Sequence, residues 1–131
     1  MTDIAFGRPR VLVIEDEQAM REILKDALAA KGFAVSVAVD GEEGLASSLR
    51  DHPDVIVLDI LLPKLDGLTV LRRLAKDVWG KKVPVVVFTN LADASGITPE
   101  MKENIYSFLP KAESDIKDLV EKVGECIQSR G

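Results

Sequence analysis

The stretch "VIVLDILLP", residues 55–63, places a single carboxylate, Asp59, between apolar residues on both sides. The four aliphatic residues before Asp59 are typical of a strand buried on both faces. A carboxylate at the end of such a strand is costly to remove from water unless a cation or hydrogen-bond donors hold it. The stretch therefore predicts a central strand whose end carries a functional charge.

Length and composition limit what this charge can do. The 131 residues predict one domain, spanning 1–131 with a core at about 10–128. A net charge of −5 argues against a general affinity for nucleic acid or anionic membranes. Cys126 is the only cysteine, and no apolar run approaches the roughly 20 residues of a membrane span. A cytoplasmic protein is expected.

Short β-branched runs alternate with longer segments of helical period, which is typical of parallel strands joined by crossover helices. We expect the strands at 10–14, 33–38, 55–58, 83–89 and 106–109. We expect the helices at 17–31, from 40 to about 50, at 67–78, from 99 onward, and at 114–128. Helix ends are expected to be capped by Gly32, Asp40, Asp66 and Thr98. The pattern predicts an α/β fold, a doubly wound five-stranded parallel sheet with five helices.

Polar side chains follow four of these strands. In chain order they are Glu15 with Asp16, Asp59, Thr89 and Lys111. Ligands of open parallel sheets bind beyond the carboxyl ends of the strands, so we expect these side chains to converge there. Two carboxylates about 4 Å apart repel by roughly 1–4 kcal/mol, and a divalent cation together with Lys111 would offset that repulsion. Oxygen ligands favour Mg²⁺.

These residues carry a family resemblance. From about Arg10 to Ile127 the chain resembles a response-regulator receiver domain of two-component signalling, of the single-domain chemotaxis-receiver type. The motifs are "IEDE" (14–17), "PDVIVLDILLPKLDG" (53–67), Thr89 and Lys111. The resemblance implies a flavodoxin-like sheet of strand order 2-1-3-4-5.

The resemblance also implies roles for the residues. Asp59 would accept a phosphoryl group from the phosphohistidine of a histidine kinase or phosphotransfer protein. Asp16, Asp59 and the backbone carbonyl of Leu61 would bind Mg²⁺ directly, and Glu15 would bind it through water. Thr89 and Lys111 would contact the phosphoryl oxygens. Such a chain is a signalling domain and not an enzyme for other substrates, although it catalyses its own Mg²⁺-dependent phosphorylation and dephosphorylation.

The family's switch would use Phe108. Inward movement of Thr89 would vacate space for this aromatic ring and repack the face made by the fourth helix, the fifth strand and the fifth helix. A downstream protein target would bind that face, with no direct role for nucleic acid or membrane, and a phosphorylation-dependent homodimer is allowed. A role for Phe108 in core packing alone is an equally open interpretation.

The sequence departs from the family pattern in places that leave alternatives open. Asn90 follows Thr89 where a small residue is usual, and Ala112 follows Lys111 where proline is usual. The segment 90–104 is a poor helix before Pro99. The main alternative is a receiver-like interaction module that binds partners without being phosphorylated.

Two enzyme or carrier classes are less compatible with the residues. A flavodoxin-type electron carrier is disfavoured because "EDEQ" (15–18) would repel a phosphate. A metal-dependent phosphatase or nuclease is disfavoured because Leu61 stands where such proteins usually carry a second acid.

Three single residues have simpler expected places. His52, the only histidine, is expected at the surface. Trp79 is expected to cover the end of the helix at 67–78, and Cys126 to be buried as a small apolar residue.

Overall fold

The central element is a sheet of five parallel strands. The computed structural model describes residues 7–91 and 95–130. The strand order is β2-β1-β3-β4-β5, which confirms the order expected from the sequence. The strands are β1 (Arg10–Ile14), β2 (Ala34–Ala38), β3 (Val55–Leu58), β4 (Val85–Thr89) and β5 (Ile105–Pro110).

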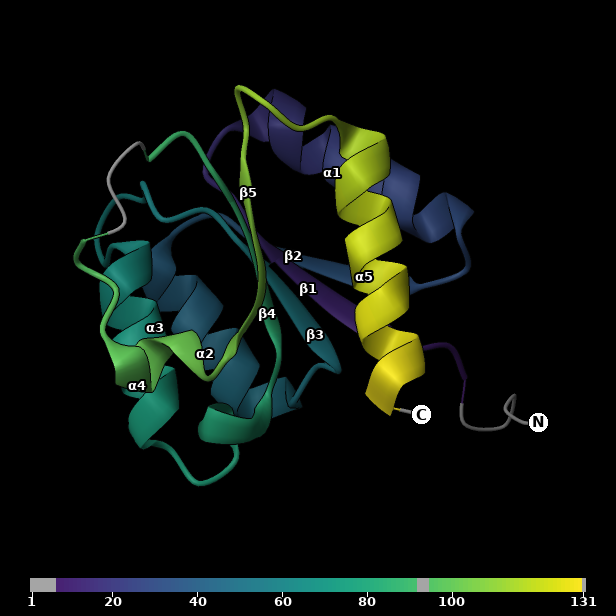
Figure 1. The fold of residues 1–131 in the computed structure, drawn as a ribbon. Coiled ribbons are helices and arrows are strands. Elements are labelled where there is room, and N and C mark those ends of the chain that lie inside the picture. Colours follow the sequence, from purple (N-terminus) through teal and green to yellow (C-terminus); the bar gives the residue numbers. More distant parts are fainter. Residues whose placement is uncertain (1–6, 92–94, 131) are drawn as a thin grey trace.

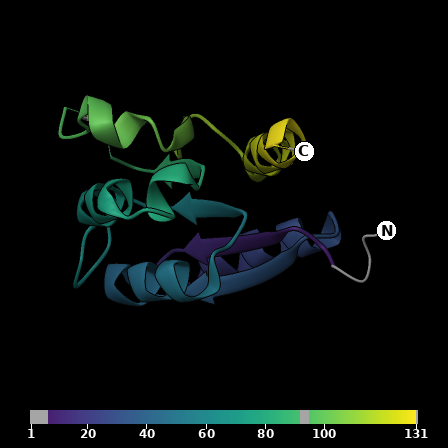
Figure 2. The same cartoon turned by 90° about the horizontal axis from the view of Figure 1, so that it is seen from below.

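Helices cover both faces of this sheet. They are α1 (Gln18–Ala30), α2 (Gly41–Asp51), α3 (Gly67–Lys76), α4 (Pro99–Lys102) and α5 (Ile116–Arg130), with a short 3₁₀ helix, η1 (Gly80–Lys82). Figures 1 and 2 show α1 and α5 on one face and α2, α3 and α4 on the other. The doubly wound architecture is therefore as predicted. Among the described residues, no helix combines the length and apolar character needed to cross a membrane.

Strand β3 explains why the stretch around Asp59 is so apolar. Val55 and Val57 belong to the core beneath α1 and α5, whereas Ile56 and Leu58 belong to the core beneath α2, α3 and α4. Burial on both faces stabilises the fold by about 1.5–3 kcal/mol for each such side chain. The sheet continues one residue further, because the backbone N–H of Asp59 donates to the carbonyl of Ile14 at 3.1 Å.

The expected helix caps are present. Backbone N–H groups donate to Asp40 Oδ1 and Asp66 Oδ1, each at 2.8 Å, and to Thr98 Oγ1 at 3.3 Å. Gly32 follows α1 with a φ of +95°, a conformation that glycine adopts without the steric cost of a Cβ. These contacts fix where α1 ends and where α2, α3 and α4 begin.

The segment between α3 and β4 differs from the expectation. Helix α3 ends at Lys76 rather than at 78, because Asp77 Oδ2 accepts the N–H groups of Trp79 and Gly80 at 3.0 and 2.7 Å. The 3₁₀ helix η1 follows, so β4 begins at Val85 rather than at 83. Asp77 therefore forms a turn that the helical period of the sequence did not reveal.

Helix α4 is only four residues long, which agrees with the weak helical signal before Pro99. Residues 92–94 of the segment 90–104 lie outside the described part of the chain. None of the peptide bonds among the described residues is cis, including the bond between Lys111 and Ala112.

His52 and Cys126 occupy their expected places, whereas Trp79 lies in the turn between α3, which already ends at Lys76, and η1. His52 is exposed, and its ring stacks on Trp79 at a centroid distance of 4.3 Å and an interplanar angle of 8°. Trp79 is half-buried against the core beneath α2 and α3, and Cys126 is buried in the core beneath α1 and α5.

Candidate functional site

The carboxyl edge of the sheet gathers the five polar side chains that the sequence placed at strand ends. Glu15 and Asp16 follow β1, Asp59 follows β3, Thr89 ends β4, and Lys111 follows β5. Because β1, β3, β4 and β5 are consecutive neighbours in the sheet, their carboxyl ends lie side by side. The Lys111 ammonium bridges the group, with Nζ 2.8 Å from Glu15 Oε1 and 3.1 Å from Asp59 Oδ2.

Three donors hold the carboxylate of Asp59, whose exposed fraction is only 6%. Its Oδ1 accepts the Thr89 hydroxyl at 2.8 Å and the backbone N–H of Leu61 at 3.1 Å. Its Oδ2 accepts Lys111 Nζ. A buried carboxylate with this set of donors is compensated, and each donor is also placed to meet an anion bound to Asp59.

The backbone fixes Lys111 in this position. Its N–H donates to the carbonyl of Thr89 at 2.8 Å, which extends the pairing of β4 and β5 by one step. Burial by itself would lower the pKa of Lys111, but hydrogen bonds to Glu15 and Asp59 outweigh it and raise the pKa. The side chain is therefore a full cation at neutral pH.

Glu15 shows the opposite balance. Burial raises its pKa, and the hydrogen bonds from Lys111 and from the backbone N–H of Glu17 offset that effect only in part. With an exposed fraction of 2%, Glu15 depends on Lys111 for its charge compensation.

Three carboxylates are close enough to share one cation. Glu15, Asp16 and Asp59 each offer an oxygen, and these oxygens lie within 4.8 Å of one another. Asp16 is exposed, so the group opens to solvent on one side. Hard oxygen donors with room for water fit Mg²⁺.

Arg21 is a positioning residue that the sequence reasoning missed. Its Nη1 donates to the backbone carbonyls of Glu15 and Asp16 at 3.1 and 3.2 Å. These contacts fix the backbone that carries both carboxylates. Only the position of Arg21 in the first turns of the helix after β1 could have indicated this role.

Phe108 lies on β5, away from the carboxylates. Phe108 pairs with Val87 of β4, which lies two positions before Thr89. The ring is half-buried against the core beneath α2, α3 and α4. It borders a surface hollow of about 380 Å³ together with Ile97, Lys102 and Ile105. Space beside the ring is therefore available, and Thr89 and Phe108 are linked through the pairing of β4 with β5.

Apolar side chains surround the open side of the carboxylate group. A hollow of about 510 Å³ borders Asp16 and is lined mainly by aliphatic residues, among them Leu61, Leu62 and Leu91. Leu61 is half-exposed, and Asn90 is exposed. The site is thus a small cluster of polar side chains bordered by apolar side chains.

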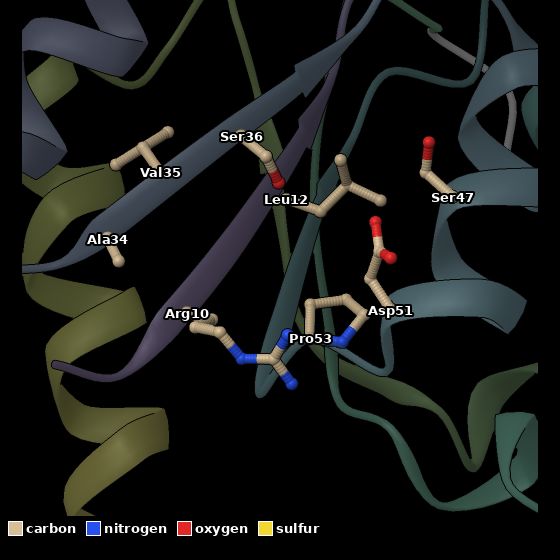
Figure 3. A pocket seen from close by; sticks show the side chains of 8 residues that line it. All are labelled: Arg10, Leu12, Ala34, Val35, Ser36, Ser47, Asp51 and Pro53. Atoms are coloured by element: carbon tan, nitrogen blue, oxygen red, sulfur yellow. The ribbon is translucent and has the colours of Figure 1, made fainter. Parts of the chain in front are cut away.

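A third hollow, of about 210 Å³, lies between β1, β2 and α2 at the opposite end of the strands (Figure 3). Its charged groups are already engaged, because Arg10 donates to the carbonyl of His52 and Asp51 pairs with Arg50. This hollow therefore lacks the group of three carboxylates found at the carboxyl edge.

Comparison with known proteins agrees with the geometry. Residues 11–124 match the response regulator receiver domain. The chain belongs to this family. It is 36% identical over 107 residues to the response regulator PleD of Caulobacter vibrioides, covering 82% of this chain and 24% of that protein. It is 37% identical over 102 residues to the response regulator MprA of Mycobacterium leprae, covering 78% of this chain and 44% of that protein.

The solved structures include the Francisella response regulator 1452 receiver domain, with a TM-score of 0.82 and 28% identity. That match covers 94% of this chain and 99% of the other. The receiver domain spans less than half of the length of PleD and MprA, so the activities of those longer proteins are not carried over to it. Phosphorylation and Mg²⁺ are typical of the family, and the acidic group at the carboxyl edge fits that kind of site.

Proposed function

We propose that Asp59 accepts a phosphoryl group from the phosphohistidine of a histidine kinase or phosphotransfer protein. The observation that carries this proposal is a buried carboxylate at the carboxyl edge of the sheet. It is held by Lys111 and Thr89 and lies close to two further acids. Receiver domains are phosphoacceptors as a family, and the contacts of Asp59 with Lys111 and Thr89 support its assignment as the acceptor in this chain. The transfer would take place in the cytoplasm, as the sequence leads us to expect.

The chain's residues supply the nucleophile and the donors for this transfer. An oxygen of Asp59 forms a bond to phosphorus while the bond from phosphorus to the donor's imidazole nitrogen breaks. The electron pair stays on that nitrogen, which takes a proton from solvent. Phosphoryl transfer depends mainly on positioning and on donors to the equatorial oxygens, and Lys111 and Thr89 are placed to provide them.

Mg²⁺ would be held by Asp16, Asp59 and the backbone carbonyl of Leu61, with Glu15 acting through water. When bound it supplies positive charge to the phosphoryl oxygens and offsets the repulsion among the carboxylates. Glu15 and Asp59 share Lys111 without it, so the chain's own cation already neutralises part of this charge.

We propose that the contacts of Thr89 transmit the effect of phosphorylation from Asp59 to Phe108. In the unphosphorylated protein the Thr89 hydroxyl already donates to Asp59 Oδ1, and its oxygen accepts the N–H of Leu91 at 3.2 Å. Donation to a phosphoryl oxygen would redirect this hydroxyl and disturb the segment after β4. Phe108 would then repack in its hollow and alter the face made by α4, β5 and α5, where a downstream protein target would bind.

The test uses beryllofluoride, a mimic of the acyl phosphate, with Mg²⁺. We expect saturable binding that requires both components, with changed hydrogen exchange around Asp59 and in residues 105–109. Without binding, the chain would be a receiver-like interaction module that is not phosphorylated. If beryllofluoride binds but hydrogen exchange changes only at Asp59 and its neighbours, the proposed role of Phe108 is contradicted and the proposed role of Asp59 is not.

A further inference from the structure

The end of the molecule opposite Asp59 carries a concentration of positive charge. Residues 72–82 hold five cations and one carboxylate, a net charge of +4, so the rest of a chain of net charge −5 sums to −9. These residues form the second half of α3, the turn after it and η1. Because this segment leads into β4, it lies at the amino end of the strands (lower end of Figure 1). We call the five cations the basic end: Arg72, Arg73, Lys76, Lys81 and Lys82.

All five side chains are exposed, and none of them forms an ion pair with a described residue. One hydrogen bond is recorded for them, from Arg72 to Thr69 Oγ1 at 3.3 Å. The single carboxylate of the segment, Asp77, accepts backbone N–H groups of the turn. The cations of the basic end are therefore available to an anionic partner.

An apolar centre lies among these cations. Val78 is 77% exposed, the highest value among the exposed large apolar residues of the described chain. Next to it, the half-buried Trp79 presents a ring that is stacked on His52. Because Val78 and Trp79 join α3 to η1, they sit between the two groups of cations.

Helix electrostatics account for only part of this arrangement. Arg73 and Lys76 lie in the last turn of α3, where cations offset the helix dipole. Lys81 and Lys82 lie beyond that helix, so the helix dipole does not explain their position. It does not explain the exposure of Val78 either, because this side chain is uncharged. The remaining features suit a binding surface, with an apolar and aromatic centre inside a charged rim.

We propose that the basic end, with Val78 and Trp79, binds an acidic polypeptide segment that also carries apolar side chains. Its carboxylates would pair with the five cations, and its apolar side chains would cover Val78 and the ring of Trp79. A nucleic acid fits less well, because its phosphates continue beyond the patch and meet the rest of the chain, whose formal charge sums to −9. The surface is separate from Asp59 and does not depend on phosphotransfer.

The test uses a synthetic peptide of repeated Glu-Glu-Leu-Ser, with a Gln-Gln-Leu-Ser peptide of equal length as its uncharged match. Calorimetry measures binding, and emission of Trp79, the single tryptophan of the chain, locates it. We expect saturable binding of the Glu peptide only, with an affinity that falls as salt rises. The double variant Lys81→Gln/Lys82→Gln should weaken binding about fivefold, as expected for two rim ion pairs.

The matched control is Lys25→Gln/Lys117→Gln, which removes two exposed cations from α1 and α5 and should leave the affinity unchanged. Val78→Ser should weaken binding without changing its salt dependence. The proposal is overturned by absent binding, by equal binding of the Gln peptide or by an equal loss in the control variant. Tighter binding of oligothymidylate than of the Glu peptide would also overturn it and assign the surface to nucleic acid.

Discussion

The two ends of the sheet hold their charges in opposite ways. At the carboxyl edge, Lys111 is shared by Glu15 and Asp59, so removing this cation leaves two buried carboxylates without an ion pair. At the amino end, the cations of the basic end face solvent separately, without ion pairs among the described residues. Linked buried charges are interdependent, whereas exposed charges act nearly independently. Folding should therefore be sensitive to the loss of the shared cation at the first end and tolerant of the loss of cations at the second.

The largest effect should come from Asp59→Asn, which separates chemistry from folding at the carboxyl edge. Phosphorylation by acetyl phosphate and Mg²⁺ should be lost completely, because an amide oxygen is not a competent acceptor. The amide oxygen can still accept from Thr89 and Leu61, so the free energy of unfolding should change by less than about 1 kcal/mol. Intact-protein mass spectrometry and thermal unfolding measure the two results.

Asp26→Asn is the matched control, because Asp26 is an exposed residue of α1. It should be phosphorylated like the wild type. Phosphorylation that persists in Asp59→Asn would place the acceptor at another residue.

Lys111→Met tests the interdependence directly. It leaves Glu15 buried without a cation and removes one donor from Asp59, so it should lower the free energy of unfolding by about 2–4 kcal/mol. This loss of unfolding free energy should become smaller as pH falls through the raised pKa of Glu15. At low pH the folded state binds a proton at Glu15, and a neutral Glu15 needs no cation. Urea unfolding at several pH values measures both effects.

Lys122→Met provides the comparison, since its pair with Glu125 is exposed on both sides. That variant should change stability by less than about 0.5 kcal/mol. Similar losses in the two variants would show that the carboxyl edge is not interdependent.

Mg²⁺ should stabilise the wild type by about 1–3 kcal/mol when it is well above its dissociation constant. Asp16→Ala should remove most of that gain while costing little in the absence of metal, because Asp16 is exposed and belongs to the group of three carboxylates. Thermal unfolding with Mg²⁺, compared with K⁺ at matched ionic strength, measures the difference. An equal gain in Asp16→Ala would exclude Asp16 as a ligand.

Much of the carboxyl edge could be predicted from the sequence, because parallel strands bring their ends together whatever their exact length. Asp59 and Lys111 are 52 residues apart, yet the order of the strands places them in contact. The buried runs of β3 and β4 indicated central strands, and the polar residues after them indicated the site. The roles of those residues in phosphotransfer remain predictions.

The segment from 76 to 85 could not be predicted in the same way. Val78 continues the apolar period of α3, but the Asp77 side chain captures two backbone N–H groups and ends the helix. A side-chain turn of this kind competes with the helix locally and leaves no periodic signal. The stacking of His52 on Trp79 joins residues from two different loops, so it depends on the finished fold. The exposed apolar centre of the basic end emerged only from the structure.

The smallest effect should come from Lys81→Gln/Lys82→Gln, the same double variant that tests peptide binding. Neither lysine pairs with a described acid, so removing both charges breaks no recorded attraction and relieves repulsion among neighbouring cations. The free energy of unfolding should therefore change by less than about 0.5 kcal/mol, and at low salt the change should be toward greater stability. Urea unfolding at low and high salt measures this. A loss comparable to that of Lys111→Met would mean that the lysines support the fold, and the tolerance expected of the amino end would then be wrong.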